Sequence, residues 1–414
     1  MRWSLLQAVS KRQCASRWKT SCYLHSPKKY YSEKRLPEDS ADYHKRSPPW
    51  NIMFFGTDDF SLRSLKALHT AQRTGDLIRR LDVVSVLLKK STPAVRRYCQ
   101  KEGLEVIDWP VVVPQGVYDI GIVVSFGHLI PASVISAFPM GIINLHGSLL
   151  PRWRGAAPVI HTLLNNDHLT GITIMRIAPR RFDVGHVVSK VEVQVKWNTK
   201  SKELTAHLAE VGAQELVSLL PNLPEHLNKA YPQSSEGVTK APKVDERASR
   251  AQWSEWSCSD VQARFRALDD YMPLWTLWQE KPAKLRSMVM QQEWSMKTKD
   301  TETDLPAESD GSEKKNGTQK LVTDDKKVKN GSADANSPRN YGCDSLDNQS
   351  QKMDETEVPG RVVYDRKQRV IRVHCRDGWV AFQRVILKGH RPMTAQDFYN
   401  GFITKVPKDS HMFT

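Results

Sequence analysis

The sequence predicts an α/β protein with two domains, a doubly wound parallel sheet followed by a small β-barrel. Apolar strand-like and amphipathic helix-like segments alternate between residues 50 and 223, which is typical of βαβ units. Short β-branched segments with tight turns follow beyond residue 273, as in small barrels. The length of 414 residues is sufficient for two hydrophobic cores.

The first domain is expected to begin after the Pro48-Pro49 pair, where "NIMFFGTDDFSLRSLKALHT" indicates a buried strand, a glycine turn and an amphipathic helix. Further strands are expected at 82–88, 104–110, 118–126, 141–146 and 171–177, and further helices at 95–103, 130–138 and 201–223. Parallel strands joined by helices form a sheet that is covered on both faces. We place this domain at residues 49–225.

The turn "FFGTDDF" argues against a dinucleotide site. It has one glycine where the dinucleotide fingerprint has three. Asp58 and Asp59 would also repel a pyrophosphate at the start of the helix. We expect these two acids to cap the helix instead.

The second domain is expected at residues 246–295 and 358–405, after a linker at 226–245 that is interrupted by Pro and Ser. It combines the capped helix "CSDVQARFRAL" with short antiparallel strands that turn at Asp365-Arg366 and Asp377-Gly378. Residues 296–357 are rich in Asp, Glu, Lys, Ser and Asn and have little apolar surface to bury, which predicts a disordered insertion. An error in the gene prediction is the alternative for this segment.

The chain is strongly basic, with a formal charge of +15 and a pI of about 9.5, which favours an anionic partner such as nucleic acid or anionic lipid. Part of this charge lies in residues 1–45. The first 32 residues hold seven Lys or Arg, six Ser and no acid, with Leu5, Leu6 and Val9 at helical spacing. This pattern predicts a disordered mitochondrial transit peptide. A disordered basic tail is the alternative, and a secretory signal fits less well because the apolar run is too short.

Composition also argues against two classes of protein. No apolar run approaches the roughly 18 residues of a membrane span, and the mean hydropathy is −0.52. The six cysteines, at positions 14, 22, 99, 258, 343 and 375, show no CxxC and no spacing with His pairs. We therefore expect no membrane span, no disulfide framework and no metal site.

The motif "INLHGSLLPRWRGAAP" carries the strongest chemical signal. Asn144 and His146 are two residues apart at the end of a predicted strand, so their side chains point the same way. A neutral imidazole can move a proton near pH 7, and an amide can stabilise a developing oxyanion. A carboxylate should orient the imidazole, and we favour Asp183 in a Gly-bearing loop over Asp167 or Asp119.

The loop after His146 is punctuated by Pro and Gly, so a shaped loop is expected there rather than a helix. Arg152 and Arg154 lie in it, and rigid neighbours make anion or phosphate binding by their guanidiniums plausible. Salt-bridged surface arginines are the alternative.

This motif, continued to "VIHTLLNNDHLTGITIMRI", resembles the signature of the methionyl-tRNA formyltransferase family. The segments "DIGIVVSFGHLIP" and "RFDVGHVVSK" match the same family, and "WTLW", "GRVVYD", "RDGWV" and "MTAQDFYNGF" resemble its second domain. The similarity covers most of residues 50 to 405. It implies a Rossmann-like catalytic domain and an OB-like β-barrel that binds tRNA. The basic leader resembles that of the mitochondrial members, which implies the matrix as the location.

The resemblance implies transfer of a formyl group from 10-formyltetrahydrofolate to the α-amine of methionine on initiator tRNA. Asn144 and His146 would stabilise the oxyanion and relay the proton, Asp183 would pair with His146, and no metal would be needed. The folate would lie between two segments, "SFGHL" and "SLLP". The implied folate-binding residues are Ser125, Phe126, Gly127, Leu129, Ser148, Leu149, Leu150 and Pro151.

The resemblance also implies a basic path for tRNA, and we expect a monomer. The candidate phosphate contacts are Arg152, Arg154, Lys89, Lys90, Lys240, Lys243, Arg247, Arg250, Lys388 and Arg391. One departure is the segment "LLKKSTPAVRRY", which is shorter than the basic loop usual in the family after the second strand. Lys89, Lys90, Arg96 and Arg97 are the residues that would replace it.

Two other functions are compatible with parts of the sequence. Other formyltransferases and hydrolases that use 10-formyltetrahydrofolate share the Asn-His-Asp triad, so the triad does not separate them from the tRNA enzymes. The barrel domain and the SLLPRWRGAAP loop favour tRNA as the acceptor. A non-catalytic RNA-binding protein is the second of these alternatives, and the intact Asn144, His146 and Asp183 argue against it.

Overall fold

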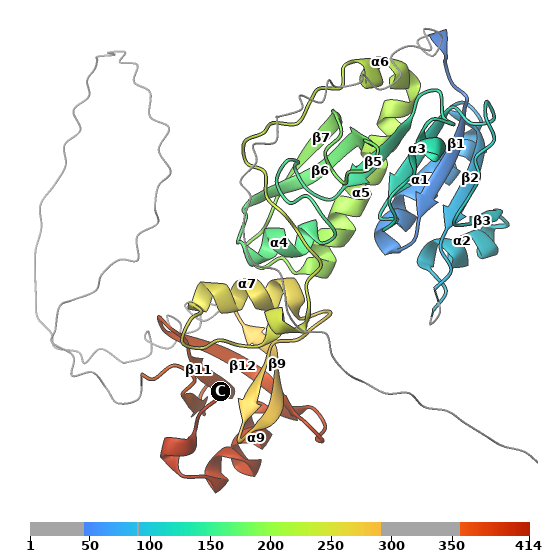
Figure 1. Cartoon of the computed structure of the whole chain (residues 1–414). Helices are drawn as coiled ribbons and strands as arrows, with labels where there is room; N and C mark the ends of the chain where they lie inside the picture. Colours follow the sequence, from blue (N-terminus) through green and yellow to red (C-terminus); the bar gives the residue numbers. More distant parts are fainter. Residues whose placement is uncertain (1–44, 89–90, 291–356) are drawn as a thin grey trace, which may run out of the picture. The chain divides into compact units, whose positions relative to one another are not determined.

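The computed structural model describes residues 45–88, 91–290 and 357–414 (Figure 1). The expected transit peptide and the expected insertion lie outside the described residues, apart from Lys45 and Glu357. Lys89 and Lys90 lie outside them as well. In the part of the chain that is described, no helix is both long and apolar enough to cross a membrane.

A seven-stranded sheet forms the first domain, in the order β3-β2-β1-β4-β5-β6-β7. The strands are β1 (Trp50–Gly56), β2 (Ile78–Ser85), β3 (Val106–Asp108), β4 (Ile120–Val124), β5 (Ile142–His146), β6 (Leu169–Arg176) and β7 (Val187–Gln194). The first five are parallel, which confirms the doubly wound architecture. The last two are antiparallel to β5 and to each other, so the sheet is not wholly parallel.

The antiparallel direction of β6 follows from the connection that precedes it. The residues after β5 form a compact loop and then α4 (Pro158–Leu164), a helix of 7 residues that is about 10 Å long. This connection returns the chain to the edge of the sheet that it left, where Thr173 of β6 pairs with His146. The expectation of a parallel strand at 171–177 was therefore wrong. The loop between β6 and β7 instead folds back to bring Asp183 to His146.

Strand β2 is shifted from the expected range of 82–88. Its first residue, Ile78, pairs with Trp50 of β1, so the strand begins earlier than the apolar run suggests. The end of that run leaves the sheet, and Leu87 is 70% exposed. Pairing with β1, rather than local apolar content, sets the bounds of this strand.

Helices cover both faces of the sheet. On one face, α1 (Asp59–Thr74), α2 (Ala94–Glu102) and α5 (Ser201–Leu219) pack against alternate residues of the strands. On the other face lies the short α3 (Ala132–Ile135). The Asp58 side chain accepts a hydrogen bond of 3.0 Å from Ser61 N, which confirms the expected cap of α1.

The expected helix 201–223 is divided in the structure. Pro221 and Pro224 lack backbone N–H donors, so α5 ends before them. A 3-10 turn (Leu220–Asn222) and α6 (Leu223–Asn228) continue the chain.

The second domain is a curled antiparallel sheet in the order β10-β11-β12-β9-β8, with β13 paired to β12. Its elements are α7 (Cys258–Leu268), β8 (Trp275–Trp278), β9 (Lys281–Val289), β10 (Val362–Asp365), β11 (Val370–His374), β12 (Trp379–Leu387), β13 (Met393–Thr394) and α9 (Ala395–Gly401). Short 3-10 turns lie at Glu246–Ser249, Ile403–Lys405 and Lys408–Ser410. Buried aromatic side chains, among them Phe265, Phe382 and Phe398, fill the concave side.

The segment from His411 to Thr414 closes this sheet into a barrel. Leu277 of β8 exchanges two backbone hydrogen bonds with Thr414, at 2.8 and 3.1 Å. On the other side, Val362 N of β10 donates to His411 O at 2.8 Å. Phe413 lies between them and is buried in the core. The expected domain end at residue 405 therefore left out the segment that joins the two edge strands.

Candidate active site

Strand β5 delivers Asn144 and His146 to one face of the sheet. Ile143 and Leu145 point into the core under α1 and α5, whereas Ile142 faces the opposite core under α3. Asn144 and His146 share the face of Ile142 because side chains alternate along a strand. His146 is 7% exposed and ends the strand, next to the loop that begins at Gly147.

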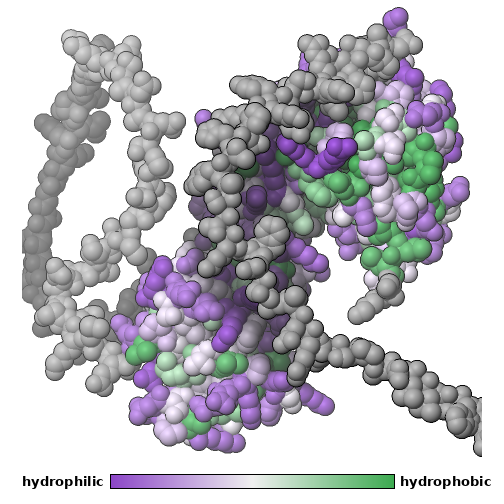
Figure 2. All heavy atoms as spheres, viewed as in Figure 1, coloured by the Kyte–Doolittle hydropathy of each residue, from purple (hydrophilic) through white to green (hydrophobic). Residues whose placement is uncertain are grey.

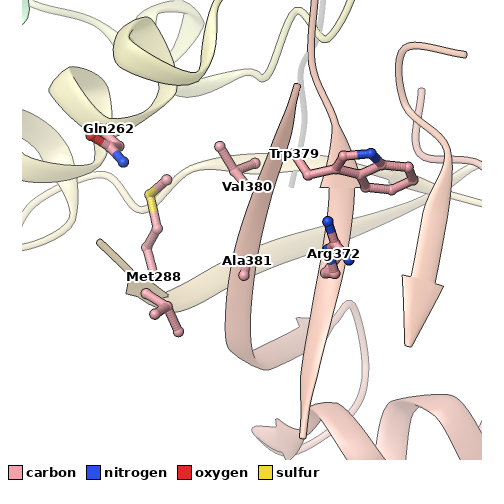
Figure 3. Close-up of a pocket in the computed structure, with 7 residues that line it drawn as sticks. Gln262, Met288, Arg372, Trp379, Val380 and Ala381 are labelled. Carbon is pink, nitrogen blue, oxygen red and sulfur yellow. The ribbon is translucent and has the colours of Figure 1, made fainter. Parts of the chain in front are cut away.

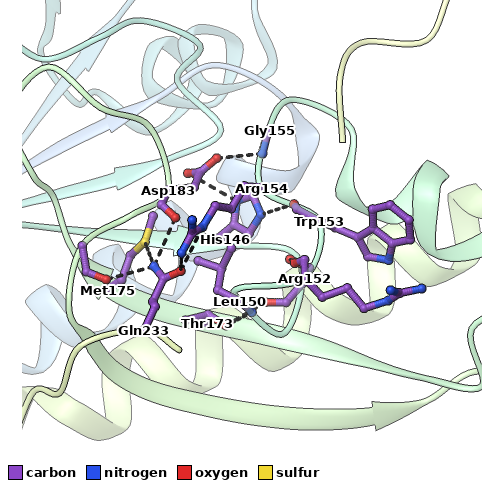
Figure 4. Close-up of polar contacts among 12 residues, drawn as sticks. His146, Leu150, Arg152, Trp153, Arg154, Gly155, Thr173, Met175, Asp183 and Gln233 are labelled. Atoms are coloured by element: carbon purple, nitrogen blue, oxygen red, sulfur yellow. Dashed lines mark hydrogen bonds and ion pairs between the residues drawn. The ribbon is translucent and has the colours of Figure 1, made fainter. Parts of the chain in front are cut away.

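The two nitrogens of the His146 ring face different partners (Figure 4). Nε2 lies 2.9 Å from the carbonyl oxygen of Trp153, which can only accept, so Nε2 carries a proton in this arrangement. Nδ1 lies 3.6 Å from Oδ1 of Asp183. Nδ1 is therefore the ring nitrogen that is available to take up and release a proton.

The structure places Asp183, rather than Asp167 or Asp119, beside the imidazole. Asp167 accepts hydrogen bonds from Arg152 and Trp153, and Asp119 pairs with Arg46 at 2.5 Å. Neither forms a hydrogen bond or an ion pair with His146. Of the three candidates from the sequence, Asp183 is the one that the fold brings to the ring.

Asp183 is held in a left-handed backbone conformation, with φ of 55°, by contacts at both ends of the residue. Its Oδ2 accepts a hydrogen bond of 2.9 Å from Gly155 N, and its backbone oxygen accepts one of 3.1 Å from Gln233 Nε2. Gln233 also donates to Gly185 O at 2.9 Å and accepts from Arg154 at 2.6 Å. Figure 4 shows the Gln233 amide between Arg154 and the Asp183 loop.

The sequence did not predict Gln233 as a site residue. It lies in the segment expected to be a linker, and the stretch "YPQSSEG" has the composition of an ordinary loop. The same segment contacts the loop after His146 through Thr239, whose Oγ1 accepts a hydrogen bond of 2.8 Å from Trp153 N. Residues 231–241 thus form part of the wall of the site.

The segment "SLLP" is locked by hydrogen bonds to strand β6. Thr173 Oγ1 donates to Ser148 O at 2.7 Å and accepts from Leu150 N at 3.0 Å. The Ser148 hydroxyl donates 2.7 Å to Arg152 O within the loop. The side chains of Ser148 and Leu150 are fully buried, so they shape the loop, and Leu149 and Pro151 are half-buried.

Arg152 and Arg154 are both engaged inside the protein. Arg152 forms a two-pronged contact with Asp167, at 2.8 and 2.6 Å, and this hydrogen bonding raises the pKa of its guanidinium. Its guanidinium also lies 4.3 Å from the centre of the Trp153 ring. Arg154 donates two hydrogen bonds to Gln233. Phosphate binding by either residue remains a prediction, and in this structure both brace the loop.

The segment "SFGHL" lies on the β4 side of β5. Ser125 donates to Asp58, and the buried Phe126 ring packs edge-on against Phe55 and Trp109 at 5.6 and 5.2 Å between centroids. Gly127 adopts a φ of 78°, and Leu129 is 44% exposed. Within the described chain, no backbone hydrogen bond outside the strand ladders involves residues 126–129. Their peptide groups are thus available to a ligand.

The other expected phosphate contacts in the described residues, apart from Arg152 and Arg154, are on the surface. These exposed side chains are Lys240, Lys243, Arg247, Arg250, Lys388 and Arg391. Figure 2 shows hydrophilic residues over much of the visible face of the second domain. Arg96, by contrast, is bound to Asp108 and two backbone carbonyls, and Arg97 is bound to Thr92 O.

A cavity of about 200 Å³ lies in the second domain (Figure 3). Gln262 and Met288 line one side of it and Trp379 the other, with the Arg372 guanidinium 5.1 Å from the Trp379 ring centre. None of the residues predicted from the sequence lines it. Across the described ranges, no group of three His, Cys, Asp or Glu side chains is placed to hold a metal ion.

This chain is similar to known formyl transferases. A formyl transferase model matches residues 112–220, and a model of the formyl transferase C-terminal domain matches residues 336–403. The mitochondrial methionyl-tRNA formyltransferase of Rattus norvegicus is 36% identical over 411 residues, covering 97% of this chain and 91% of the relative. The Homo sapiens protein of the same name is 37% identical, covering 88% and 81%. The structure of HypX from Aquifex aeolicus in complex with tetrahydrofolic acid aligns with a TM-score of 0.49 at 13% identity, over 86% of this chain and 48% of that one.

Proposed function

We propose, from the premise that this chain belongs to the methionyl-tRNA formyltransferase family, that it formylates methionine on initiator tRNA in the mitochondrial matrix. The donor is a folate-derived formyl carrier, and we infer that it is 10-formyltetrahydrofolate. The observation that carries the proposal is the convergence of His146 and Asp183 beside Asn144 on one face of β5. The transit-peptide role of residues 1–45 stays a prediction.

In the proposed reaction, the free α-amine of methionine attacks the formyl carbon of the donor. A carbon–nitrogen bond forms, and negative charge develops on the formyl oxygen. The Asn144 amide makes no side-chain hydrogen bond to another described residue, so its N–H donors are free to stabilise this oxygen. The bond from the formyl carbon to the folate nitrogen then breaks.

A proton must pass from the attacking amine to the departing folate nitrogen. Nε2 of His146 is engaged with Trp153 O, so we assign the transfer to Nδ1. The imidazolium that forms would lie next to Asp183, whose carboxylate stabilises it and orients the ring. Gly155 N and Gln233 hold that carboxylate and its backbone in place.

We place the donor between residues 125–129 and 148–151. The backbone of 126–129 has unused donors and acceptors that can pair with a pterin edge. The buried side chains of Phe126, Ser148 and Leu150 would support these segments rather than touch the ligand. Leu149, Pro151 and Leu129 are the side chains with surface to offer it.

The experiment that tests the proposal is transfer of a labelled formyl group to methionyl-tRNA, with charged initiator and elongator tRNAs compared. The purified chain should formylate the charged initiator and leave uncharged tRNA unmodified. His146→Ala should lower kcat by about 10²- to 10⁴-fold, because the proton relay is lost. Its affinity for initiator tRNA should stay near that of the parent, and a large loss of affinity would count against the catalytic role of His146.

A further inference from the structure

The loop between β6 and β7 presents three exposed side chains directly before Asp183. Arg180 and Arg181 are exposed, and Phe182 is 59% exposed. Neither guanidinium has an ion pair or a hydrogen bond to another residue in the described parts of the chain. An exposed aromatic ring directly beside two unpaired cations and Asp183 is an arrangement that an anionic ligand with stacked bases can use.

The loop is presented in a defined position. Gln233 fixes the backbone on both sides of Val184, through Asp183 O at 3.1 Å and Gly185 O at 2.9 Å. Gly185 lies so close to Arg176 O that a side chain there would overlap it. The three exposed residues are thus carried by an anchored segment, one to three positions from Asp183.

The order of strands puts β5, which carries His146, between this loop and the donor segment 125–129. The segment 125–129 follows β4, whereas the Arg180–Phe182 loop joins β6 to β7, and β5 lies between β4 and β6. With the donor held from the β4 side, the acceptor amine can approach the formyl carbon from the β6 side, within reach of His146. The loop is therefore on the acceptor side.

The segment that anchors this loop carries two exposed lysines, with Glu236 as the exposed acid between Gln233 and Lys240. The backbone of Lys240 pairs with that of Arg154, whose side chain contacts Gln233. Lys240 and Lys243 are exposed and lie on the segment that anchors the Asp183 loop. The carboxylate of Asp183 is turned inward, toward Gly155 N and His146, so it does not neutralise these lysines.

We propose that Arg180, Arg181 and Phe182 dock the unpaired 3′ end of the acceptor RNA. The guanidiniums contact its phosphates as planar forks, and the Phe182 ring stacks on a base. Aromatic rings interleaved with cations are what single-stranded RNA binds without base-specific hydrogen bonds. This docking would bring the methionyl amine to Nδ1 of His146. The inference rests on the proposed function, because it assumes an RNA-borne amine as acceptor.

The test is steady-state formylation by the full chain, with the concentration of charged initiator tRNA varied. We expect Arg180→Gln combined with Arg181→Gln to raise KM for the RNA about tenfold or more. The slope of log affinity against log salt should also fall by about 1.4, which corresponds to two phosphate contacts on a single strand. Phe182→Ala should weaken RNA binding about fivefold or more, and Phe182→Tyr should restore it because the ring is kept. The binding constant of tetrahydrofolate, measured by titration calorimetry, should not change.

The matched control is Arg63→Gln combined with Arg79→Gln. These two arginines are exposed on the same domain, on α1 and β2, and should leave KM and the salt slope unchanged. An unchanged KM for RNA in the Arg180 and Arg181 variant overturns the proposal, as does weaker folate binding, which would assign the loop to the donor. If the double variant does not fold, Phe182→Ala compared with Phe182→Tyr decides by the same measurements. Failure of the parent chain to formylate charged tRNA would instead refute the proposed function.

Discussion

The two loops that flank His146 are held in very different ways. The loop from Gly147 to Ala157 is bonded to β6 through Thr173 and to the connecting segment through Thr239 and Ala241. The loop from Ile177 to His186 is closed at its ends by backbone hydrogen bonds from Ile177 N to Ile142 O and from Arg176 N to His186 O, and between them it depends on Gln233 and on Gly155 N. The first is therefore a rigid wall with several redundant contacts. The second, the arm, is held around Asp183 by Gln233 and Gly155 N, and it carries the carboxylate that we propose to act with His146.

The largest effect should come from the residue that joins the two loops, Gly155. Its φ is +130°, and a Cβ there would lie 2.5 Å from Ala241 O. Gly155→Ala should displace the N–H that binds Asp183 and lower kcat about 100-fold or more. Gly237→Ala is the matched control, because Gly237 also has a positive φ but has open space around it. This variant should lower the unfolding temperature and leave kcat unchanged. Equal losses of kcat in the two variants would refute the role of Gly155.

The next largest effect should come from Gln233→Glu. A carboxylate keeps the contact with Arg154 but cannot donate to Asp183 O or Gly185 O. We expect kcat to fall about tenfold or more, with the pH profile of kcat altered, while thermal unfolding stays near that of the parent. Gln233→Ala should lower both kcat and the unfolding temperature. Parent-like kcat in the Glu variant would mean that the arm does not need this anchor.

A smaller effect is expected where contacts are redundant. Arg152→Gln removes the two hydrogen bonds to Asp167. Because the Arg152 side chain is 43% exposed, we expect the free energy of unfolding to fall by only about 1 kcal/mol. Calorimetry should show a fall of about 3 °C in Tm, with KM for charged tRNA unchanged. A raised KM with an unchanged Tm would instead favour Arg152 as a phosphate contact, as the sequence suggested.

The smallest effect should follow deletion of residues 296–357 and their replacement by a short Gly-Ser linker. Closing a shorter loop changes the free energy of unfolding by about 0.6 kcal/mol for each halving of its length. Formylation should be the same as in the parent chain, measured side by side. A strong loss of activity would assign this segment a role in the reaction.

Local patterns were sufficient to predict much of the catalytic domain. The spacing of Asn144 and His146 predicted a shared face, and the alternation of apolar runs predicted the first five strands. Asp183 was selected correctly among three acids for proximity to His146, although the strand before it runs in the opposite direction. The direction of β6 depends on how the chain turns after His146, and no residue pattern encodes that turn by itself.

The features that the sequence did not predict share a cause. Gln233 acts through hydrogen bonds to backbone atoms 48 to 50 positions away, which leave no local pattern. Thr414 pairs with a strand that precedes it by 137 residues along the chain, according to the contact with Leu277. Strand β7 was not expected either, although the alternation in "VVSKVEVQ" is consistent with its half-buried position at the sheet edge.

The closure of the barrel by residues 411–414 bears on how the protein is handled. Thr414 O accepts from both Leu277 N and Thr276 Oγ1, so this carbonyl is part of the barrel wall. A purification tag or fluorescent reporter joined directly to Thr414 would begin inside a hydrogen-bonded seam and would compete with it. Such fusions should carry a flexible spacer, and thermal melts of tagged and untagged protein would show whether the seam survives.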